Sequence, residues 1–264
     1  MMKIGVIPNS FGVPFKEAVL LAKKIGAQGL QPYVTGGELA PENLTAQDRK
    51  DVLKYVKDNG MVFSALCADF GMNFKVVGEN EEAVQRTMRM MDLAKDLGTN
   101  VITTHIGKVP DDENCAEYAN MVTNIERLGK YGDSIGVVFA TETGPEPALS
   151  LKGILDKADT KSAKVNLDPA NLFMCAGENP VKSVLILGKY IAHTHAKDGQ
   201  MNPDGSYTEY RLGDGGVPFK EYIGALKQVG YDGYLTIERE GGAARFDDIS
   251  HAVKLLKNIL EQLH

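Results

Sequence analysis

Short runs of β-branched residues alternate with amphipathic helical segments of about a dozen residues, and this alternation repeats eight times along the chain. The strand candidates span residues 3–8, 29–34, 61–67, 100–106, 135–142, 163–168, 190–195 and 233–239. In a parallel sheet the chain reaches the next strand through a crossover helix, and no break in composition divides the eight units. The pattern therefore predicts an α/β fold with one domain, residues 1–264, shaped as a closed (β/α)8 TIM barrel.

The alternative architecture is an open doubly wound sheet. Such a sheet is expected to carry a glycine-rich phosphate loop after its first strand, whereas "IPNSFGVPF" matches neither G-x-G-x-x-G nor a P-loop. A chain of 264 residues, 43% of them hydrophobic, is also long enough for one barrel with a large core. The barrel is therefore favoured.

The charge and cysteine content narrow the class of protein. Lys and Arg total 29 against 35 Asp and Glu, and the net charge of −6 is spread along the chain, which disfavours nucleic acid as a partner. The three cysteines are far apart and form no C-x-x-C pair, so they suit packing roles in a reducing compartment. "MMKIGVIPNS" lacks the features of a signal peptide, and no run of about 18 apolar residues occurs. These features predict a soluble cytoplasmic protein without a membrane partner.

Ionisable side chains stand near the ends of five predicted strands, on the side that the alternation directs toward the barrel interior. They are His105, Glu142, Asp168, His195 and Glu238. Active sites of this fold lie at the carboxyl ends of the strands, and converging buried carboxylates repel one another unless a positive group is present. Two Glu, one Asp and one His suit a divalent metal ion, whether Mn²⁺, Mg²⁺, Co²⁺ or Zn²⁺. The alternative is a salt-bridged polar plug in the barrel.

Other polar residues are candidates for contacts with a substrate. His105 would contact substrate or a ligand water, or serve a structural role, while His193 lies one layer deeper and suits a supporting hydrogen bond. Lys197 would hold an oxyanion or phosphate if it points into the site, but as a loop residue it could equally be solvated. Arg211 would bind an anionic group or form an ordinary loop salt bridge, and Glu146 in "GPEP" is predicted at the rim.

Several motifs carry a resemblance to a known family. "FATETGPEPALS", "VNLDPANLF", "AHTHAKDG", "RLGDGGVPF" and "GYDGYLTIERE" resemble the sugar phosphate isomerase/epimerase family of xylose isomerase-like TIM barrels, which is related in fold to the endonuclease IV class. The resemblance implies one divalent ion held by Glu142, Asp168, His195 and Glu238. It also implies a small-molecule sugar or sugar derivative as substrate and a possible homo-oligomer.

The sequence departs from the ketose 3-epimerase pattern at two places. The residue three positions after Asp168 is Asn171 rather than a substrate-binding His, and the position six residues after His195 is Met201 rather than Arg. The endonuclease relatives also need a His where Asn171 stands, together with further ligands for a three-metal cluster. Asn171 remains a substrate-binding candidate, but the departures change what the substrate is expected to be.

The resulting functional prediction is a metal-dependent isomerase or epimerase of a sugar or keto-sugar, with Mn²⁺ as the first choice of ion. The ion would stabilise an enediolate, and Glu142 and Glu238 would act as base and acid on opposite faces of the substrate. A metal-dependent lyase or dehydratase acting on a keto-sugar, inosose or keto-glycoside is the chemical alternative, because the same enediolate can expel a β-leaving group. A non-catalytic sugar-binding barrel is the non-enzymatic alternative.

Overall fold

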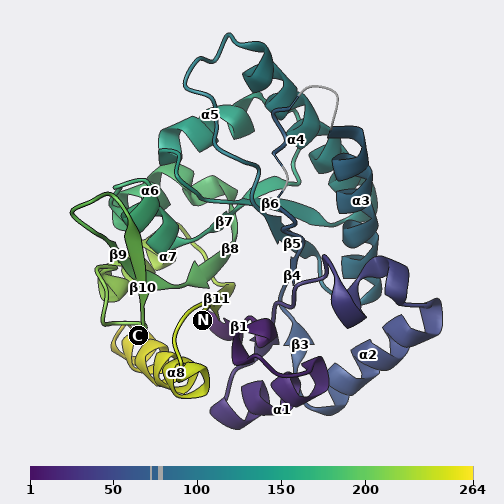
Figure 1. Cartoon of the computed structure of the whole chain (residues 1–264), viewed down its shortest axis with the longest axis vertical. Coiled ribbons are helices and arrows are strands. Elements are labelled where there is room, and N and C mark those ends of the chain that lie inside the picture. Colours follow the sequence, from purple (N-terminus) through teal and green to yellow (C-terminus); the bar gives the residue numbers. More distant parts are fainter. Residues whose placement is uncertain (72, 77–79, 264) are drawn as a thin grey trace.

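The computed structural model describes residues 1–71, 73–76 and 80–263 as a barrel of parallel strands surrounded by helices (Figure 1). The barrel strands are β1 (Lys3–Val6), β2 (Gly29–Leu30), β3 (Val62–Phe63), β4 (Leu66–Cys67), β5 (Val101–Thr104), β6 (Val138–Glu142), β7 (Ala163–Leu167), β8 (Ile191–Ala196) and β11 (Tyr234–Ile237). Every pairing between them is parallel. The predicted TIM barrel is confirmed.

The third predicted strand, 61–67, closes the barrel although it is interrupted. Its first half, β3, pairs with β2, and its second half, β4, pairs with β5, so the two halves join opposite ends of the sheet order β3-β2-β1-β11-β8-β7-β6-β5-β4. The predicted strand 29–34 is also shorter than expected, since regular pairing stops at Leu30. Pro32 has no N–H to donate to a ladder, although its carbonyl still accepts from Cys67 N at 2.8 Å.

Eight α-helices in the described part of the chain form the outer ring. They are α1 (Phe15–Ile25), α2 (Ala46–Asp58), α3 (Asn80–Asp96), α4 (Ala116–Ile135), α5 (Ala148–Lys157), α6 (Pro180–Leu187), α7 (Phe219–Gln228) and α8 (Arg245–Gln262). Short 3-10 turns lie at η1 (Pro8–Phe11), η2 (Gly37–Leu39), η3 (Pro41–Asn43) and η5 (Gly188–Tyr190), and η4 (Asn171–Cys175) is a π-helical turn. None of the helices in the described ranges has the length and apolar character needed to cross a membrane.

Side chains inside the barrel change from apolar to polar to ionisable along the strands. Ala65, Val101 and Ala140 form a small apolar cluster separate from the main core, which supports the predicted inward register of Ala140. One layer further along the strands, Gln31 and His193 are joined by hydrogen bonds and are fully buried. The outward-facing side chains of the same strands pack in the main hydrophobic core. This alternation brings the ionisable strand ends to one side of the barrel.

An antiparallel hairpin that the sequence analysis did not predict follows β8. It consists of β9 (Asp198–Met201) and β10 (Tyr207–Tyr210), and it extends from the barrel beside β8 (Figure 1). Neither strand shows an alternating apolar pattern, because the hairpin has no fully buried face. The one local signal is Asp204-Gly205, where Gly205 has a φ of 82° that suits a tight turn.

Asp198 ties this hairpin to the loop that precedes α7. Its carboxylate accepts backbone N–H groups from Gly199, Gly213, Gly215 and Val217 at 2.9, 2.8, 3.0 and 3.0 Å. Four donors on one buried carboxylate fix the course of a glycine-rich loop that has little side-chain packing of its own. Asp198 therefore has a structural role, and it does not point toward the polar strand ends.

We expect Asp198→Ala to lower the free energy of unfolding by about 2–4 kcal/mol, because four backbone N–H groups lose their acceptor. Asp198→Asn should lower it less, since the amide keeps one of the two acceptor oxygens. Urea unfolding followed by circular dichroism measures both effects. Unfolding midpoints equal to that of the wild type would contradict this role for the carboxylate.

Candidate metal centre

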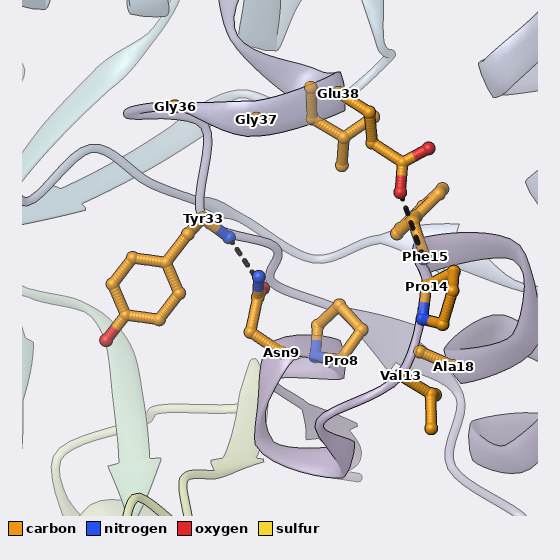
Figure 2. A pocket seen from close by; sticks show the side chains of 11 residues that line it. Pro8, Asn9, Val13, Pro14, Phe15, Ala18, Tyr33, Gly36, Gly37 and Glu38 are labelled. Atoms are coloured by element: carbon orange, nitrogen blue, oxygen red, sulfur yellow. Dashed lines mark hydrogen bonds between the residues drawn. The ribbon is translucent and has the colours of Figure 1, made fainter.

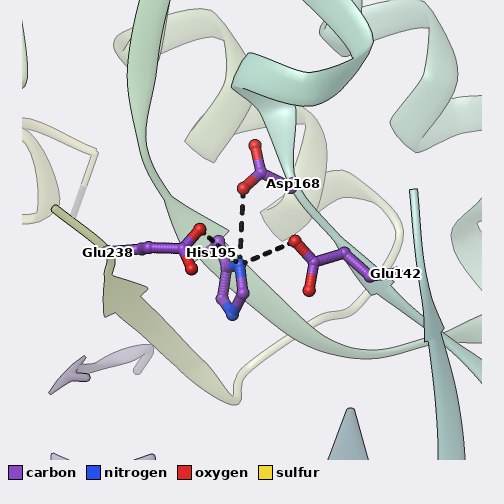
Figure 3. Close-up of side chains that lie close together, drawn as sticks. All are labelled: Glu142, Asp168, His195 and Glu238. Atoms are coloured by element: carbon purple, nitrogen blue, oxygen red, sulfur yellow. Dashed lines mark hydrogen bonds and ion pairs between the residues drawn. The ribbon is translucent and has the colours of Figure 1, made fainter. Parts of the chain in front are cut away.

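Four predicted ligand residues converge at the carboxyl ends of four strands (Figure 3). Glu142 ends β6, Asp168 directly follows β7, His195 lies in β8 and Glu238 directly follows β11. One potential ligand atom from each lies within 4.8 Å of the other three, and all four side chains are buried. The structure therefore brings together the set that the strand register and the family resemblance indicated.

The Nδ1 atom of His195 lies between the three carboxylates. It is 3.3 Å from Glu142 Oε1, 3.3 Å from Asp168 Oδ2 and 3.3 Å from Glu238 Oε2. A single N–H cannot satisfy three acceptors, and these distances exceed the ~2.7–2.9 Å of good charge-assisted hydrogen bonds. The arrangement instead suits one cation bound by three oxygens and one nitrogen, a donor set that fits Mn²⁺, Zn²⁺ and similar ions.

The protonation of these residues reflects the same crowding of charge. Burial lowers the pKa of His195, but the nearby carboxylates of Glu142 and Glu238 raise it by more than burial lowers it. The pKa of His195 therefore lies well above its ordinary value. Burial raises the pKa of Glu142 and Glu238, but His195 outweighs this effect and both pKa values lie below the ordinary range. Both carboxylates are therefore ionised at neutral pH, and a divalent ion would take the place of the proton on Nδ1.

Gln31 supports His195 from the layer below. Gln31 Nε2 donates to Thr103 Oγ1 at 2.7 Å, which turns Gln31 Oε1 toward His195 Nε2 at 3.2 Å. Asn166 Nδ2 lies 3.2 Å from the same histidine nitrogen but is also engaged by Glu142 Oε2 at 3.0 Å. Because Gln31 Oε1 is an acceptor, it favours the proton on Nε2 and leaves the Nδ1 lone pair for an ion. Gln31 lies in the predicted strand 29–34, but no sequence pattern marked it as a site residue.

Two of the predicted substrate-binding residues contact Glu142. Asn171, in η4, donates from Nδ2 to Glu142 Oε1 at 3.2 Å and to the Thr143 carbonyl at 3.1 Å. His105 Nε2 lies 3.6 Å from Glu142 Oε1, and His105, with 39% of its side chain exposed, lines the pocket beside the cluster. Burial lowers the pKa of His105, but Glu142 and Asp69 raise it above its ordinary value. Both residues lie where they would touch a molecule bound next to the cluster.

Lys197 points into the site. Its Nζ donates to Glu238 Oε2 at 3.1 Å and pairs with Glu240, and only 6% of its side chain is exposed. Burial lowers its pKa, but Glu238 and Asp168 raise the pKa above its ordinary value. The solvated alternative considered for this residue does not describe the structure.

The other two predicted substrate-binding residues do not line the pocket. Arg211 Nε pairs with Asp214 Oδ2 at 2.9 Å on an exposed loop, which is the ordinary loop salt bridge considered as its alternative. Glu146 is buried rather than at an open rim, and its Oε1 accepts from Gly144 N at 3.0 Å. Arg211 is therefore paired with Asp214 rather than directed at the four-residue cluster.

A pocket of about 240 Å³ opens over the cluster. Besides the residues already described, its lining includes several that the sequence analysis did not select: Tyr33, Cys67, Asp69, Met174, Cys175, Tyr207 and Glu240. Burial raises the pKa of Cys67 and Cys175, so both stay as thiols at neutral pH. The volume lies below the ~300–1,000 Å³ of sites for drug-sized ligands, which indicates a small ligand.

A second pocket, of about 200 Å³, lies beside the first and shares Tyr33 with it (Figure 2). Tyr33 N donates to Asn9 Oδ1 at 3.0 Å, and the Tyr33 hydroxyl donates to Glu238 Oε1 at 3.4 Å. Glu38 accepts from Phe15 N at 3.0 Å at the start of α1. Among the described residues that line this pocket, ionisable side chains do not converge, so the first pocket is the candidate functional site.

Comparison of the sequence with known proteins identifies the family of this chain. Residues 19–259 match the model of the xylose isomerase-like TIM barrel family. An inosose dehydratase of Lacticaseibacillus casei is 25% identical over 162 residues, 53% of this chain and 53% of the relative. An L-ribulose 3-epimerase of Methylomonas sp. is 32% identical over 146 residues, 52% of this chain and 48% of the relative. The chain spans about half the length of these two relatives.

A further relative matches over most of its length. A putative L-ribulose-5-phosphate 3-epimerase of Haemophilus influenzae is 23% identical over 253 residues, 89% of this chain and 88% of the relative. The predicted resemblance to sugar isomerases and epimerases is thus confirmed at the level of the family.

Solved structures with the same fold cover nearly all of the chain. A xylose isomerase domain protein from Planctomyces limnophilus has a TM-score of 0.84 at 22% identity, covering 93% of this chain and 92% of that one. A D-tagatose 3-epimerase-like protein has a TM-score of 0.83 at 20% identity, covering 99% and 98%. Identities this low establish the fold alone, and they agree with the barrel described above.

We expect His195→Ala and Asp168→Ala each to lower the affinity for Mn²⁺ by at least about 100-fold, because each removes one of four ligands. Calorimetric titration of chelator-treated protein gives the stoichiometry, which should be about one ion per chain in the wild type. His251→Ala, a histidine change on α8 outside the cluster, is the matched control. Equal affinities in all four proteins would exclude the cluster as the metal site.

Gln31→Met should lower metal affinity by about 10–100-fold, because it removes the acceptor of the His195 Nε2 proton while keeping a similar side-chain volume. Nitrogen NMR of the protein loaded with diamagnetic Zn²⁺ should show a His195 Nε2 proton that exchanges slowly with solvent in the wild type and faster in the variant, where its acceptor is lost. Thr103→Val, which removes only the partner of the Gln31 amide, should have a smaller effect. Equal metal affinities in Gln31→Met and the wild type would contradict this role.

Proposed function

Because this chain belongs to the xylose isomerase-like TIM barrel family, we propose that it is a divalent-metal-dependent isomerase or epimerase of a sugar or keto-sugar. The observation that carries the proposal is the buried set of Glu142, Asp168, His195 and Glu238 beside a pocket of sugar size. The names of the relatives support sugar chemistry. One relative is named for L-ribulose and another for L-ribulose 5-phosphate, so the comparisons do not decide whether the substrate of this chain carries a phosphate.

Those four residues would hold the ion, for which we propose Mn²⁺ first and Mg²⁺, Co²⁺ or Zn²⁺ as alternatives. When bound, a divalent ion would act as a Lewis acid that acidifies the C–H next to a substrate carbonyl. The protein itself must then remove and return a proton on carbon. Carboxylates within reach of that carbon are suited to both steps at neutral pH.

Glu142 and Glu238 extend toward His195 from opposite sides of the cluster (Figure 3). We assign proton removal to Glu142, which the amides of Asn166 and Asn171 hold in place through neutral hydrogen bonds. We assign proton return to Glu238. Lys197 Nζ, 3.1 Å from its Oε2, would pass a proton to this carboxylate, Glu238 would deliver it to carbon, and solvent would reprotonate Lys197. Action on two faces of the substrate gives epimerisation, whereas return by Glu142 to the neighbouring carbon gives isomerisation.

A metal-dependent lyase or dehydratase on a keto-sugar, inosose or keto-glycoside is the second candidate. Similarity to an inosose dehydratase supports it, and so does the amide of Asn171 at the position where the 3-epimerase pattern has histidine. Proton removal by Glu142 would be the same first step, followed by loss of a β-hydroxyl or aglycone instead of reprotonation.

Incubation of Mn²⁺-loaded protein with a panel of ketoses in D₂O tests the proposal. Deuterium on carbon in recovered sugar supports the isomerase or epimerase, and loss of water or an aglycone supports the lyase. Metal-bound protein with no turnover of any panel member, keto-glycosides included, would instead favour a sugar-binding barrel.

Substitution of the two carboxylates separates their roles. Glu142→Gln should lower turnover by about 10²–10⁴-fold and abolish deuterium exchange on the face of the substrate that Glu142 serves, since Glu142 is the base assigned to that face. Glu238→Gln should retain exchange on the face served by Glu142 while losing epimerised product. Mass spectrometry of the sugar measures both, and Glu261→Gln on the distant end of α8 is the matched control. Equal exchange in wild type and Glu142→Gln would exclude the assigned base.

A further inference from the structure

The charges around the pocket define the class of substrate more narrowly, and we propose that the site accepts an uncharged polyhydroxy ketone and rejects a phosphorylated or carboxylated one. This inference rests on the proposed function, since it concerns the same pocket. It also limits the roles of Lys197 and Arg211, which the sequence alone offered as anion-binding residues.

Carboxylates outnumber positive charges in the pocket and the cluster beneath it. The carboxylates are Asp69, Glu142, Glu238 and Glu240 in the lining and Asp168 in the cluster, five in all. Among described residues that line the pocket, the basic side chains are His105 and Lys197. Even with His105 protonated and a divalent ion bound, four positive charges face five negative ones. A dianionic group would therefore enter a field that repels it.

Both basic side chains already face carboxylates of the site. Lys197 Nζ is held between Glu238, at 3.1 Å, and Glu240, and its side chain is nearly inaccessible. His105 Nε2 faces Glu142 Oε1 at 3.6 Å. Phosphate sites usually offer several N–H donors, often from arginine, that are not already engaged by carboxylates.

Two arginines in the loops that follow β10 and β11 are also paired with carboxylates outside the pocket. Arg239 is held by Glu209 at 2.7 Å and by Asp248 at 3.0 Å, and Arg211 is held by Asp214 at 2.9 Å. Neither lines the pocket. Reorienting either guanidinium toward a substrate would break an existing ion pair.

The position of the ligand cluster decides where a phosphate would lie. The carbonyl end of a ketose must approach the buried cluster, so the far end of its carbon chain points toward the pocket mouth. Asp69 and Glu240 lie in this outer part of the lining, where both are less buried than the cluster. A terminal phosphate would meet these two carboxylates, whereas a terminal hydroxyl can donate a hydrogen bond to either of them.

A non-reacting pair of ligands tests the inference without requiring turnover. Hexitol and hexitol phosphate lack the carbonyl, and calorimetry with Mn²⁺-loaded protein measures the dissociation constant of each. We expect the phosphate to bind at least about tenfold more weakly. Equal or tighter binding of the phosphate would overturn the inference. Preference for hexitol combined with no ketose turnover would contradict the proposed reaction while supporting the inference.

Asp69→Asn isolates one charge at the pocket mouth. The amide oxygen can still accept from Gly71 N, a bond that is 3.0 Å long in the structure, so the local turn is kept. The ratio of the hexitol phosphate and hexitol dissociation constants should fall by roughly three- to tenfold in this variant. Glu261→Gln makes the same change in net charge on an exposed site of α8 and should leave the ratio within twofold. An equal fall in both variants would overturn the inference, because it would reflect overall charge.

Discussion

Mutual repulsion among three buried carboxylates around one imidazole nitrogen is the constraint on which the site depends. Glu142, Asp168 and Glu238 each approach His195 Nδ1 at 3.3 Å, where a proton can satisfy one of them well and a divalent ion can satisfy all three. The surrounding contacts act to hold this arrangement. Gln31 sets the orientation of the imidazole, Asn166 and Asn171 hold Glu142, and Lys197 holds Glu238.

The barrel makes such an arrangement possible because its interior is layered. Apolar side chains fill the lower part, hydrogen-bonded neutral side chains fill the middle, and ionisable ones occupy the carboxyl ends of the strands. A buried charge is costly unless polar groups lie next to it, and the middle layer supplies them. Glu142 and His195 lie in paired positions of the sheet. Asp168 and Glu238 directly follow their strands, where Asp168 N donates to Thr143 Oγ1 at 2.9 Å and Glu238 N donates to the Ala196 carbonyl at 3.2 Å. The sheet and the bonds next to it therefore place all four side chains.

The sequence predicted the barrel, and it predicted the four side chains that the structure brings together, because both follow from short-range patterns. Period-two alternation assigns an inward face to each strand, and Glu142 and His195 stand at its carboxyl end. Gln31 was missed because one amide inside a strand gives no signal until the partners from other strands are known. The β9–β10 hairpin was not predicted because it lacks an apolar face. The contacts of Asp198 were not predicted because they join backbone groups between residues 199 and 217, and such contacts produce no periodic pattern in the sequence. The sequence left open whether Arg211 binds an anionic substrate group or forms a loop salt bridge, and only the structure shows that it is paired with Asp214.

Charge links the site to its proposed substrate. The same excess of carboxylates that would attract a divalent ion would make the pocket mouth unfavourable for a phosphate, so one electrostatic feature accounts for both the proposed ion and the proposed preference for neutral sugars. Most of the stability of the barrel, by contrast, comes from the outer apolar core, which is separate from the ion and the substrate. Changes within the pocket are therefore expected to affect binding more than folding.

The most direct measurement of the central claim is anomalous X-ray diffraction from crystals of the protein grown with Mn²⁺. The account predicts one strong anomalous peak between His195 Nδ1 and the carboxylates of Glu142, Asp168 and Glu238. A well-ordered cluster with no peak at that position, and with the three carboxylates sharing the proton of His195, would contradict it.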